Sequence, residues 1–309
     1  MIPTVNGGFF LFISFDIKKR FTYISSMNVL SLFDGLSCGQ IALNRAGIKY
    51  DKYFASEIDK FAIQVTQCNY PETIQIGDVT QVKGSDLPKI DLLIGGSPCQ
   101  SFSNAGKGEG FDGKSGLFWE YVRILKEIKP TYFLLENVKM KKEWQIIISK
   151  ELEVEPILIN SNLVSAQNRE RLYWTNIPNI EKPTNKNIFI EDILDETFDE
   201  KYWLPEKNSN LLRNKVDLTN IPNLCCIDVY NKKYKTDRKS PTLTLPHHNS
   251  LRFYQDGKLR KLTPNECEKL QTVPIDYTNV GISDIHRYSM LGNGWTVDVI
   301  AHIFKNIEI

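Results

Sequence analysis

The sequence predicts an α/β fold: a parallel sheet with helices on both faces, followed by a smaller and less regular domain. From Asn28 to about Asn176, apolar runs of strand length alternate with helix-length amphipathic segments, the pattern of a parallel sheet. From about Pro178 to Lys258 the alternation stops, and the composition turns polar and rich in Asn and Lys. A chain of 309 residues has room for one large domain and one smaller domain.

The first three strands are each expected to end in a chemically distinctive residue. A strand over 29–33 runs through a glycine turn, 34–39, into a helix over 40–46 that Gly47 stops. The second strand, 53–56, ends in Glu57 before a helix over 60–69, and the third, 73–76, ends in Gly77 and Asp78.

These strand ends form a coherent pocket for a nucleoside. Parallel strands deliver Phe33, Glu57 and Asp78 to one edge of the sheet, where an acid can take ribose hydroxyls and another can accept from an exocyclic amine. Gly35 suits a turn that approaches the ligand closely. Taken alone, Glu57 could equally cap the helix that follows it.

A strand over 90–94 leads into Gly95-Gly96-Ser97-Pro98-Cys99, the most informative stretch of the chain. The glycines bend the backbone and Pro98 keeps Ser97 extended, so Cys99 is held in place at the carboxyl end of a strand. Most free cysteines are small buried apolar residues. Because a core cysteine needs no such bend, the context favours a nucleophilic thiolate.

Two later segments add charged residues to the same edge. Glu136 lies in the apolar strand 132–138, where a carboxylate is costly unless it is paired or functional. Arg169 and Arg171 alternate onto one face of a strand that ends near Thr175, and arginine offers a planar fork for a base edge or a phosphate. A structural hydrogen bond for Glu136 and a surface ion pair for the arginines are the alternatives.

The ordered motifs resemble those of the DNA cytosine C5-methyltransferases. Gly95–Ser103 is similar to their catalytic motif, Glu136-Asn137-Val138 and Gln167-x-Arg-x-Arg match two others, and Gly292-Asn293-Gly294 matches the last. Ser31 stands where the family usually has Asp, but the glycine turn and Gly-Ser-Pro-Cys look like the eukaryotic de novo branch. The resemblance implies a Rossmann-like, S-adenosylmethionine-dependent sheet with a smaller, irregular target-recognition domain.

The resemblance also implies site residues and a reaction. Cys99, Glu136, Arg169 and Arg171 would be catalytic; the cofactor residues would be Phe33, Gly35, Glu57, Asp78, Val79, Pro98, Leu117 and Asn293. The enzyme would transfer a methyl group from S-adenosylmethionine to carbon 5 of a flipped-out cytosine in a specific duplex DNA sequence, through a covalent Cys99–C6 adduct. The alternatives are a tRNA cytosine-5 methyltransferase of the same fold and a catalytically silent DNA-binding regulator.

The same family pattern divides the chain into four parts. Residues 1–27 form an N-terminal extension, 28–177 the catalytic and cofactor-binding domain, 178–258 the target-recognition domain, and 259–309 a return segment that completes the catalytic domain.

Duplex DNA is the expected macromolecular partner, and its contacts must be local. Lys+Arg 38 against Asp+Glu 37 gives a net charge of only +1, but residues 201–239 hold nine bases against four acids. Lys233, Lys235 and Arg238 are the candidates in that stretch. Gln100, Ser103 and Lys107, in and after the Cys99 turn, are further candidates for contact with DNA.

The composition argues against several other classes of protein. Six cysteines without C-x-x-C spacing predict neither a structural zinc site nor a disulfide framework, and no metal site is expected. No segment has the length of a membrane-spanning helix, so the expected location is the cytoplasm of a bacterial or phage-infected cell. We expect a monomer, with a cognate restriction endonuclease as a partner outside this chain.

Overall fold

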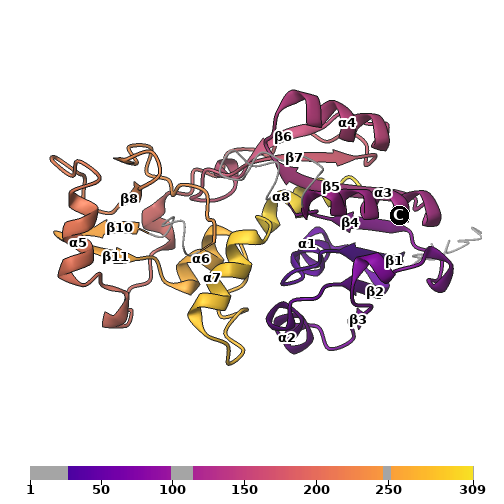
Figure 1. Cartoon of the computed structure of the whole chain (residues 1–309), viewed down its shortest axis with the longest axis horizontal. Helices are drawn as coiled ribbons and strands as arrows, with labels where there is room; N and C mark the ends of the chain where they lie inside the picture. Colours follow the sequence, from indigo (N-terminus) through magenta and orange to yellow (C-terminus); the bar gives the residue numbers. More distant parts are fainter. Residues whose placement is uncertain (1–26, 99–113, 246–251, 309) are drawn as a thin grey trace, which may run out of the picture.

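The computed structural model describes residues 27–98, 114–245 and 252–308, which form a large sheet and a small one with two helices between them (Figure 1). The large sheet has seven strands in the order β3-β2-β1-β4-β5-β7-β6. Its strands are β1 (Met27–Leu32), β2 (Tyr50–Ser56), β3 (Ile74–Gln75), β4 (Leu92–Gly95), β5 (Tyr132–Val138), β6 (Ile157–Asn160) and β7 (Glu170–Thr175).

The α/β prediction is confirmed, but the sheet is mixed instead of wholly parallel. Strands β3, β2, β1, β4 and β5 are parallel, whereas β7 runs antiparallel to both β5 and β6. Strand β7 therefore begins at the edge where β5 ends, and Arg171 pairs with Val138. Strand β2 begins at Tyr50, earlier than expected, and β3 is only two residues long.

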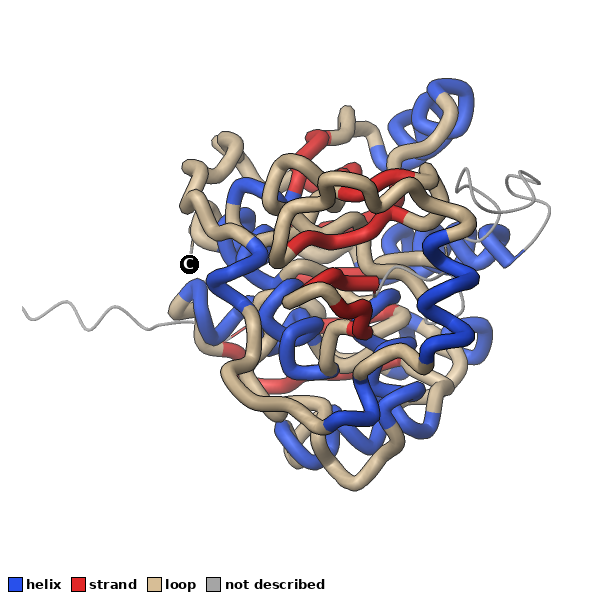
Figure 2. Tube along the Cα trace, turned by 90° about the vertical axis from the view of Figure 1, so that its left-hand side faces the viewer, coloured by secondary structure: helices blue, strands red, loops and turns tan. Residues whose placement is uncertain are grey.

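Helices cover both faces of the large sheet, as the helices on either side of the strands in Figure 2 show. On β4, Leu92 and Ile94 join the core on one face and Leu93 joins the core on the other, the alternation of a strand buried on both sides. The first face carries α1 (Cys38–Ala46), α2 (Lys60–Asn69) and α8 (Val297–Phe304), and the second carries α3 (Phe118–Ile128) and α4 (Lys142–Leu152).

Helix α8 brings the end of the chain back to the first face. It packs closely against α1, and Val299, Ile303 and Phe304 are fully buried there. Helix α1 ends as predicted at Gly47, which has a left-handed φ of 74°. The core around β1 is thus shared by residues from the two ends of the described chain.

The small sheet has more regular structure than the composition predicts. Its strands, β8 (Cys225–Asp228), β9 (Lys233–Tyr234), β10 (Arg252–Gln255) and β11 (Lys258–Lys261), are antiparallel in the order β11-β10-β8-β9. Leu212 of α5 (Glu206–Arg213) packs with Ile227 and Leu259 in a core of its own. Strand β11 extends past Lys258, the predicted end of this domain.

Two helices follow β11 and lie between the sheets in Figure 1: α6 (Pro264–Leu270) and α7 (Asp284–Asn293). Thr263 and Glu266 form a reciprocal capping box at the start of α6. Glu266 is also fully buried in a bidentate ion pair with Arg260, so it joins α6 to the small sheet. Within the described ranges, no helix is long and apolar enough to cross a membrane.

Candidate active site

A cavity of about 350 Å³ lies at the carboxyl edge of the large sheet, around the ends of β1, β2, β4 and β5. The predicted catalytic and cofactor residues that the structure describes all line it: Phe33, Gly35, Glu57, Asp78, Val79, Pro98, Leu117, Glu136, Arg169, Arg171 and Asn293. This position, beside the switch in strand order between β1 and β4, is where open α/β sheets place their ligands.

Four predicted site residues lie outside the described residues: Cys99, Gln100, Ser103 and Lys107. Pro98, immediately before Cys99, is described and lines the cavity. The turn before it is anchored, because the Asn137 side-chain amide donates to the carbonyl and hydroxyl oxygens of Ser97 at 3.3 and 3.1 Å. Asn137 and Ser97 are both buried, so this attachment of the turn to β5 is shielded from water.

The glycine turn after β1 is tightly wound. Phe33, Gly35 and Ser37 all have a left-handed φ, at 58°, 60° and 63°. For Phe33 this conformation is strained, and strain of this kind gathers at ligand sites. It places a half-buried aromatic ring on the wall of the cavity, packed against the same core as Leu117.

Glu57 is fixed by main-chain donors and does not cap α2. Its Oε2 accepts from Gly35 N at 2.8 Å, and its Oε1 accepts from the amides of Ile58 and Asp59. Asp59 is the residue that caps α2. A carboxylate has about four acceptor positions and three are used here, so Glu57 can still accept a ribose hydroxyl at Oε2.

The residues of this part of the cavity fit S-adenosylmethionine. Asp78 uses Oδ1 to accept from Thr80 N, which leaves Oδ2 to accept an adenine amine. Phe33, Val79 and Leu117 supply apolar surface for a purine ring. Ile58, which the sequence did not single out, also lines the cavity and is 75 % exposed, so a purine would cover it.

Asp34 and Cys38 are two titratable groups in the glycine turn that the sequence prediction did not use. Burial raises the pKa of Asp34 to about 6; its Oδ1 accepts from the Tyr53 hydroxyl, and its buried Oδ2 has no hydrogen-bond partner. Burial also raises the pKa of Cys38 to about 12. Cys38 is the one cysteine among the described residues that line the cavity, and at neutral pH it is a thiol and a poor nucleophile.

Glu136 lies at the other end of the cavity, held at both carboxylate oxygens. Arg171 Nε lies 2.8 Å from Oε1, and the Trp295 indole nitrogen donates to Oε2 at 3.1 Å. The carboxylate is only 7 % exposed, so these partners offset the cost of burying it. The antiparallel direction of β7 is what places Arg171 beside Glu136.

Arg169 lines the cavity from a different position, because it precedes β7 and is buried. Its guanidinium donates to three main-chain carbonyls, those of Leu243, Gly292 and Gly294, at 2.9, 3.1 and 2.9 Å. It therefore joins the segment between β9 and β10 to the end of α7. Gly292 and Asn293, part of the last motif, lie in the last turn of α7.

The comparisons with known proteins agree with this geometry. The family model for C-5 cytosine-specific DNA methylases matches residues 27–308. The type II methyltransferase M1.ScrFI of Lactococcus lactis subsp. cremoris is 32% identical, with 95% of this chain and 80% of that protein covered. The chain belongs to the C-5 cytosine-specific DNA methylase family.

Further relatives show how completely the methylase matches the family. The type II methyltransferase M.Bsp6I of Bacillus sp. (strain RFL6) is 31% identical, with 91% of the methylase and 98% of that protein covered. The solved structure of the Entamoeba histolytica methyltransferase EhMeth superposes with a TM-score of 0.71 at 18% identity, covering 91% of the methylase and 97% of that chain. The methylase is a DNA (cytosine-5)-methyltransferase of an S-adenosylmethionine-dependent family.

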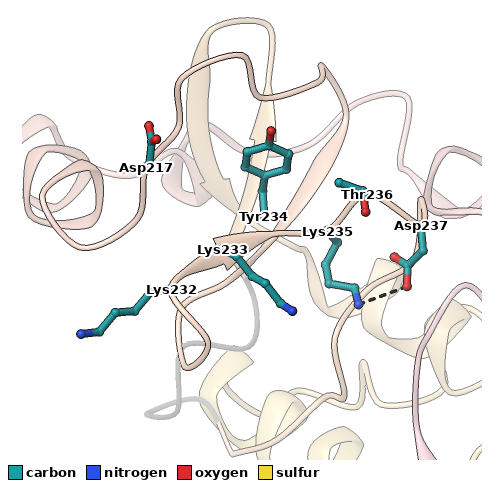
Figure 3. Close-up of a pocket in the computed structure, with 7 residues that line it drawn as sticks. All are labelled: Asp217, Lys232, Lys233, Tyr234, Lys235, Thr236 and Asp237. Atoms are coloured by element: carbon teal, nitrogen blue, oxygen red, sulfur yellow. Dashed lines mark ion pairs between the residues drawn. The ribbon is translucent and has the colours of Figure 1, made fainter.

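The described candidates for DNA contact, Lys233, Lys235 and Arg238, lie in or just after β9 and do not line the cavity; Figure 3 shows the first two. Lys233 is exposed, and it lines an open groove together with Lys232 and Lys235. Lys235 is turned to Asp237, with its ammonium 3.1 Å from the carboxylate. Arg238 is exposed but pairs with Glu191 at 2.8 Å, which partly offsets its charge toward a phosphate.

Lys239, which follows these residues, ties the small-sheet region of the methylase to the large sheet. Its buried ammonium donates to the main-chain carbonyls of Asn162, Ser165 and Ile188. Next to it, Ser240 pairs with Gln167, three residues before β7. This part of the chain is therefore an ordered support for the cavity.

Proposed function

We propose that the enzyme methylates carbon 5 of a cytosine that has left the duplex, within a specific DNA sequence and through a covalent bond from Cys99 to C6. The observation that carries the proposal is that one cavity holds both a nucleoside-binding set of residues and the paired carboxylate of Glu136. A methyl donor and an acceptor base bound there would lie side by side.

The β1–β3 end of the cavity is the proposed cofactor site. Phe33, Val79 and Leu117 would contact the adenine, Glu57 the ribose hydroxyls, and Asp78 the adenine amine. Gly35 and Pro98 would form close walls, and Asn293 would cover the site from α7. S-adenosylmethionine would supply an electrophilic methyl group at this position.

The β4–β7 end is the proposed cytosine site, and its residues activate a poor nucleophile. Carbon 5 is part of an aromatic ring, so addition of the Cys99 thiolate to C6 is needed to push electron density onto it. Glu136 would hold the N3/N4 edge and stabilise the protonated ring, and Arg171 would contact the O2 side. Arg169 would stabilise this end of the cavity through its hydrogen bonds to three main-chain carbonyls.

The remaining steps restore the aromatic ring. After C5 gains the methyl group it loses its proton to a base, and the electrons of that C–H bond expel the cysteine from C6. Cys38 does not compete as the nucleophile, because burial keeps its thiol protonated. Glu136 is nearly inaccessible, so a stacked base could not reach it, and flipping of the base is part of the proposal.

The test combines product mapping with one substitution. Purified enzyme is incubated with S-adenosylmethionine and duplex DNA, and 5-methylcytosine is mapped by bisulfite sequencing, with total tRNA as a second substrate. We expect marks on DNA at one short recurring sequence. Cys99→Ala should abolish methylation while binding of cofactor and DNA is kept, whereas Cys68→Ala, an exposed cysteine on α2, should be fully active. Turnover by Cys99→Ala would refute the covalent route.

A further inference from the structure

The indole of Trp295 reaches the proposed catalytic carboxylate from a distant part of the chain. We propose that Trp295 is a positioning residue that fixes the orientation of the Glu136 carboxylate. The inference rests on the proposed role of Glu136 in binding cytosine, and it adds a residue that the motif analysis did not include. Trp295 lies just after α7, and its Nε1 donates to Glu136 Oε2 at 3.1 Å.

Two donors from different elements hold the two oxygens of Glu136. Arg171 on β7 holds Oε1 at 2.8 Å, so Arg171 alone would leave the carboxylate able to turn about its last bond. The terminal torsion of a glutamate is broad and has no strong intrinsic preference. A second donor on Oε2 removes this freedom and fixes the plane in which the remaining lone pairs point.

Gly96 leaves the space that the indole needs. A Cβ at this position would lie 2.9 Å from Trp295 Nε1, closer than real Cβ contacts, and a tight 3.2 Å from Glu136 Oε2, so the indole would have to shift. The absence of a side chain in the bend after β4 therefore allows the Trp295–Glu136 hydrogen bond to form. Gly96 therefore leaves room for the indole in addition to its role in the bend before Cys99.

The backbone that carries Trp295 is itself held on both sides. Arg169 donates to the carbonyls of Gly292 and Gly294, and Gln271 donates to that of Gly294. The Cys38 thiol donates to the carbonyl of Trp295 at 3.7 Å. The indole therefore extends from a fixed base, and Arg169 supports Glu136 indirectly while Arg171 does so directly.

A tryptophan is chemically suited to this task. Its N–H donates only, carries no charge and does not titrate near neutral pH, so it orients the carboxylate without adding a second cation beside Arg171. Precise orientation of an acid on the base edge contributes to the rate and not to the binding of the cofactor.

The test is a double-mutant cycle on the single-turnover rate of DNA methylation. Trp295→Phe keeps an aromatic side chain and removes the donor, and we expect it to slow methylation on the order of tenfold, the effect of losing one charge-assisted hydrogen bond. In a Glu136→Ala background, Trp295→Phe should change the rate less than about twofold, because the group that it positions is gone.

A matched control separates this effect from the general cost of losing an indole. Trp174 is also buried and its N–H donates to Ser149 Oγ at 3.0 Å, but its side chain packs in the core of the second face. Trp174→Phe should lower the melting temperature and leave the methylation rate unchanged. Calorimetry should give Trp295→Phe an affinity for S-adenosylmethionine within about twofold of wild type.

Three outcomes would overturn the inference. The first is that Trp295→Phe methylates at the wild-type rate. The second is that the substitution slows the Glu136→Ala enzyme as much as it slows the wild-type enzyme. The third is that weaker cofactor binding alone explains the loss of activity. A Glu136→Ala enzyme that methylates at the wild-type rate would instead refute the proposed role of Glu136, and the inference that rests on it. Specific methylation by wild type establishes the reaction independently of either result.

Discussion

Asp34 is a carboxylate whose surroundings differ from those of an ordinary surface residue. It lies in the glycine turn after β1, with Oδ1 bonded to Tyr53 and Oδ2 buried without a partner. Burial raises its pKa to about 6, so the folded protein holds this group protonated at a pH where the unfolded chain would ionise it. Through this one residue, low pH increases the stability of the folded protein relative to the unfolded chain.

Replacing Asp34 with Asn should remove this pH dependence. Below about pH 4 the carboxyl is protonated in both states and costs nothing, and as pH rises from about 4 to 6 the unfolded state ionises first, so stability falls. Relative to Asp34→Asn, the wild type should lose about 3 kcal/mol of unfolding free energy between pH 4 and 7. Urea unfolding at several pH values measures the difference, and a flat difference curve would contradict the assignment.

The predicted catalytic and cofactor residues that the structure describes all line the cavity, but the sequence did not show how they are held. The acids and the glycine turn could be predicted because strand ends in an open sheet meet at one edge. Trp295 was missed as a partner of Glu136 because 159 positions separate the two residues. The hydrogen bonds of Arg169 could not be predicted either, because its partners are main-chain carbonyls, which every residue type supplies.

At the scale of elements, the direction of β7 decides the geometry of the site. Alternating apolar and polar residues predict a strand equally well whichever way it runs, so the sequence indicated a strand and not its antiparallel direction. Strand β3 pairs with β2 through only two residues, and a segment this short has no periodicity from which its ends could be predicted. The helices predicted over 40–46 and 60–69 lie within two residues of α1 and α2, because their patterns are longer and Gly47 gives a clear stop. Helices α4, α5 and α7 were not predicted.

Helix α8 covers part of one face of the large sheet, and a substitution that weakens its packing should lower the free energy of unfolding. Phe304 is fully buried against α1, so Phe304→Ala should lower the unfolding free energy by about 3–5 kcal/mol. Ile285, on α7, is 60 % exposed, and Ile285→Ala should change it by less than about 0.5 kcal/mol. Urea midpoints compare the two variants, and equal losses would show that α8 does not belong to the core.

At the scale of the whole molecule, the charge is nearly balanced, so affinity for DNA must come from local lysines. The net charge is +1, and the exposed Lys232 and Lys233 lie around β9, away from the acidic stretch 191–200 in sequence. A phosphate contact releases counterions and leaves a signature in the salt dependence of binding.

Lys233→Gln should weaken DNA binding and reduce the slope of log Kd against log salt by about 0.9. Lys89, 81 % exposed at the amino end of β4, lies at the opposite edge of the sheet from the cavity. Lys89→Gln should leave the slope unchanged although it removes the same charge. Identical slopes for Lys233→Gln and wild type would exclude a phosphate contact at Lys233.

The link between Glu136 and Trp295 has a consequence for how the enzyme is made. A ribosome that adds 5–20 residues per second needs roughly 10–30 s to go from one position to the other. During that interval the nascent chain carries the carboxylate without the indole, and α8 has not yet covered the sheet. Chains that terminate before Trp295 would therefore lack an assembled cavity, and DNA would meet a methylating enzyme only after that residue has been added.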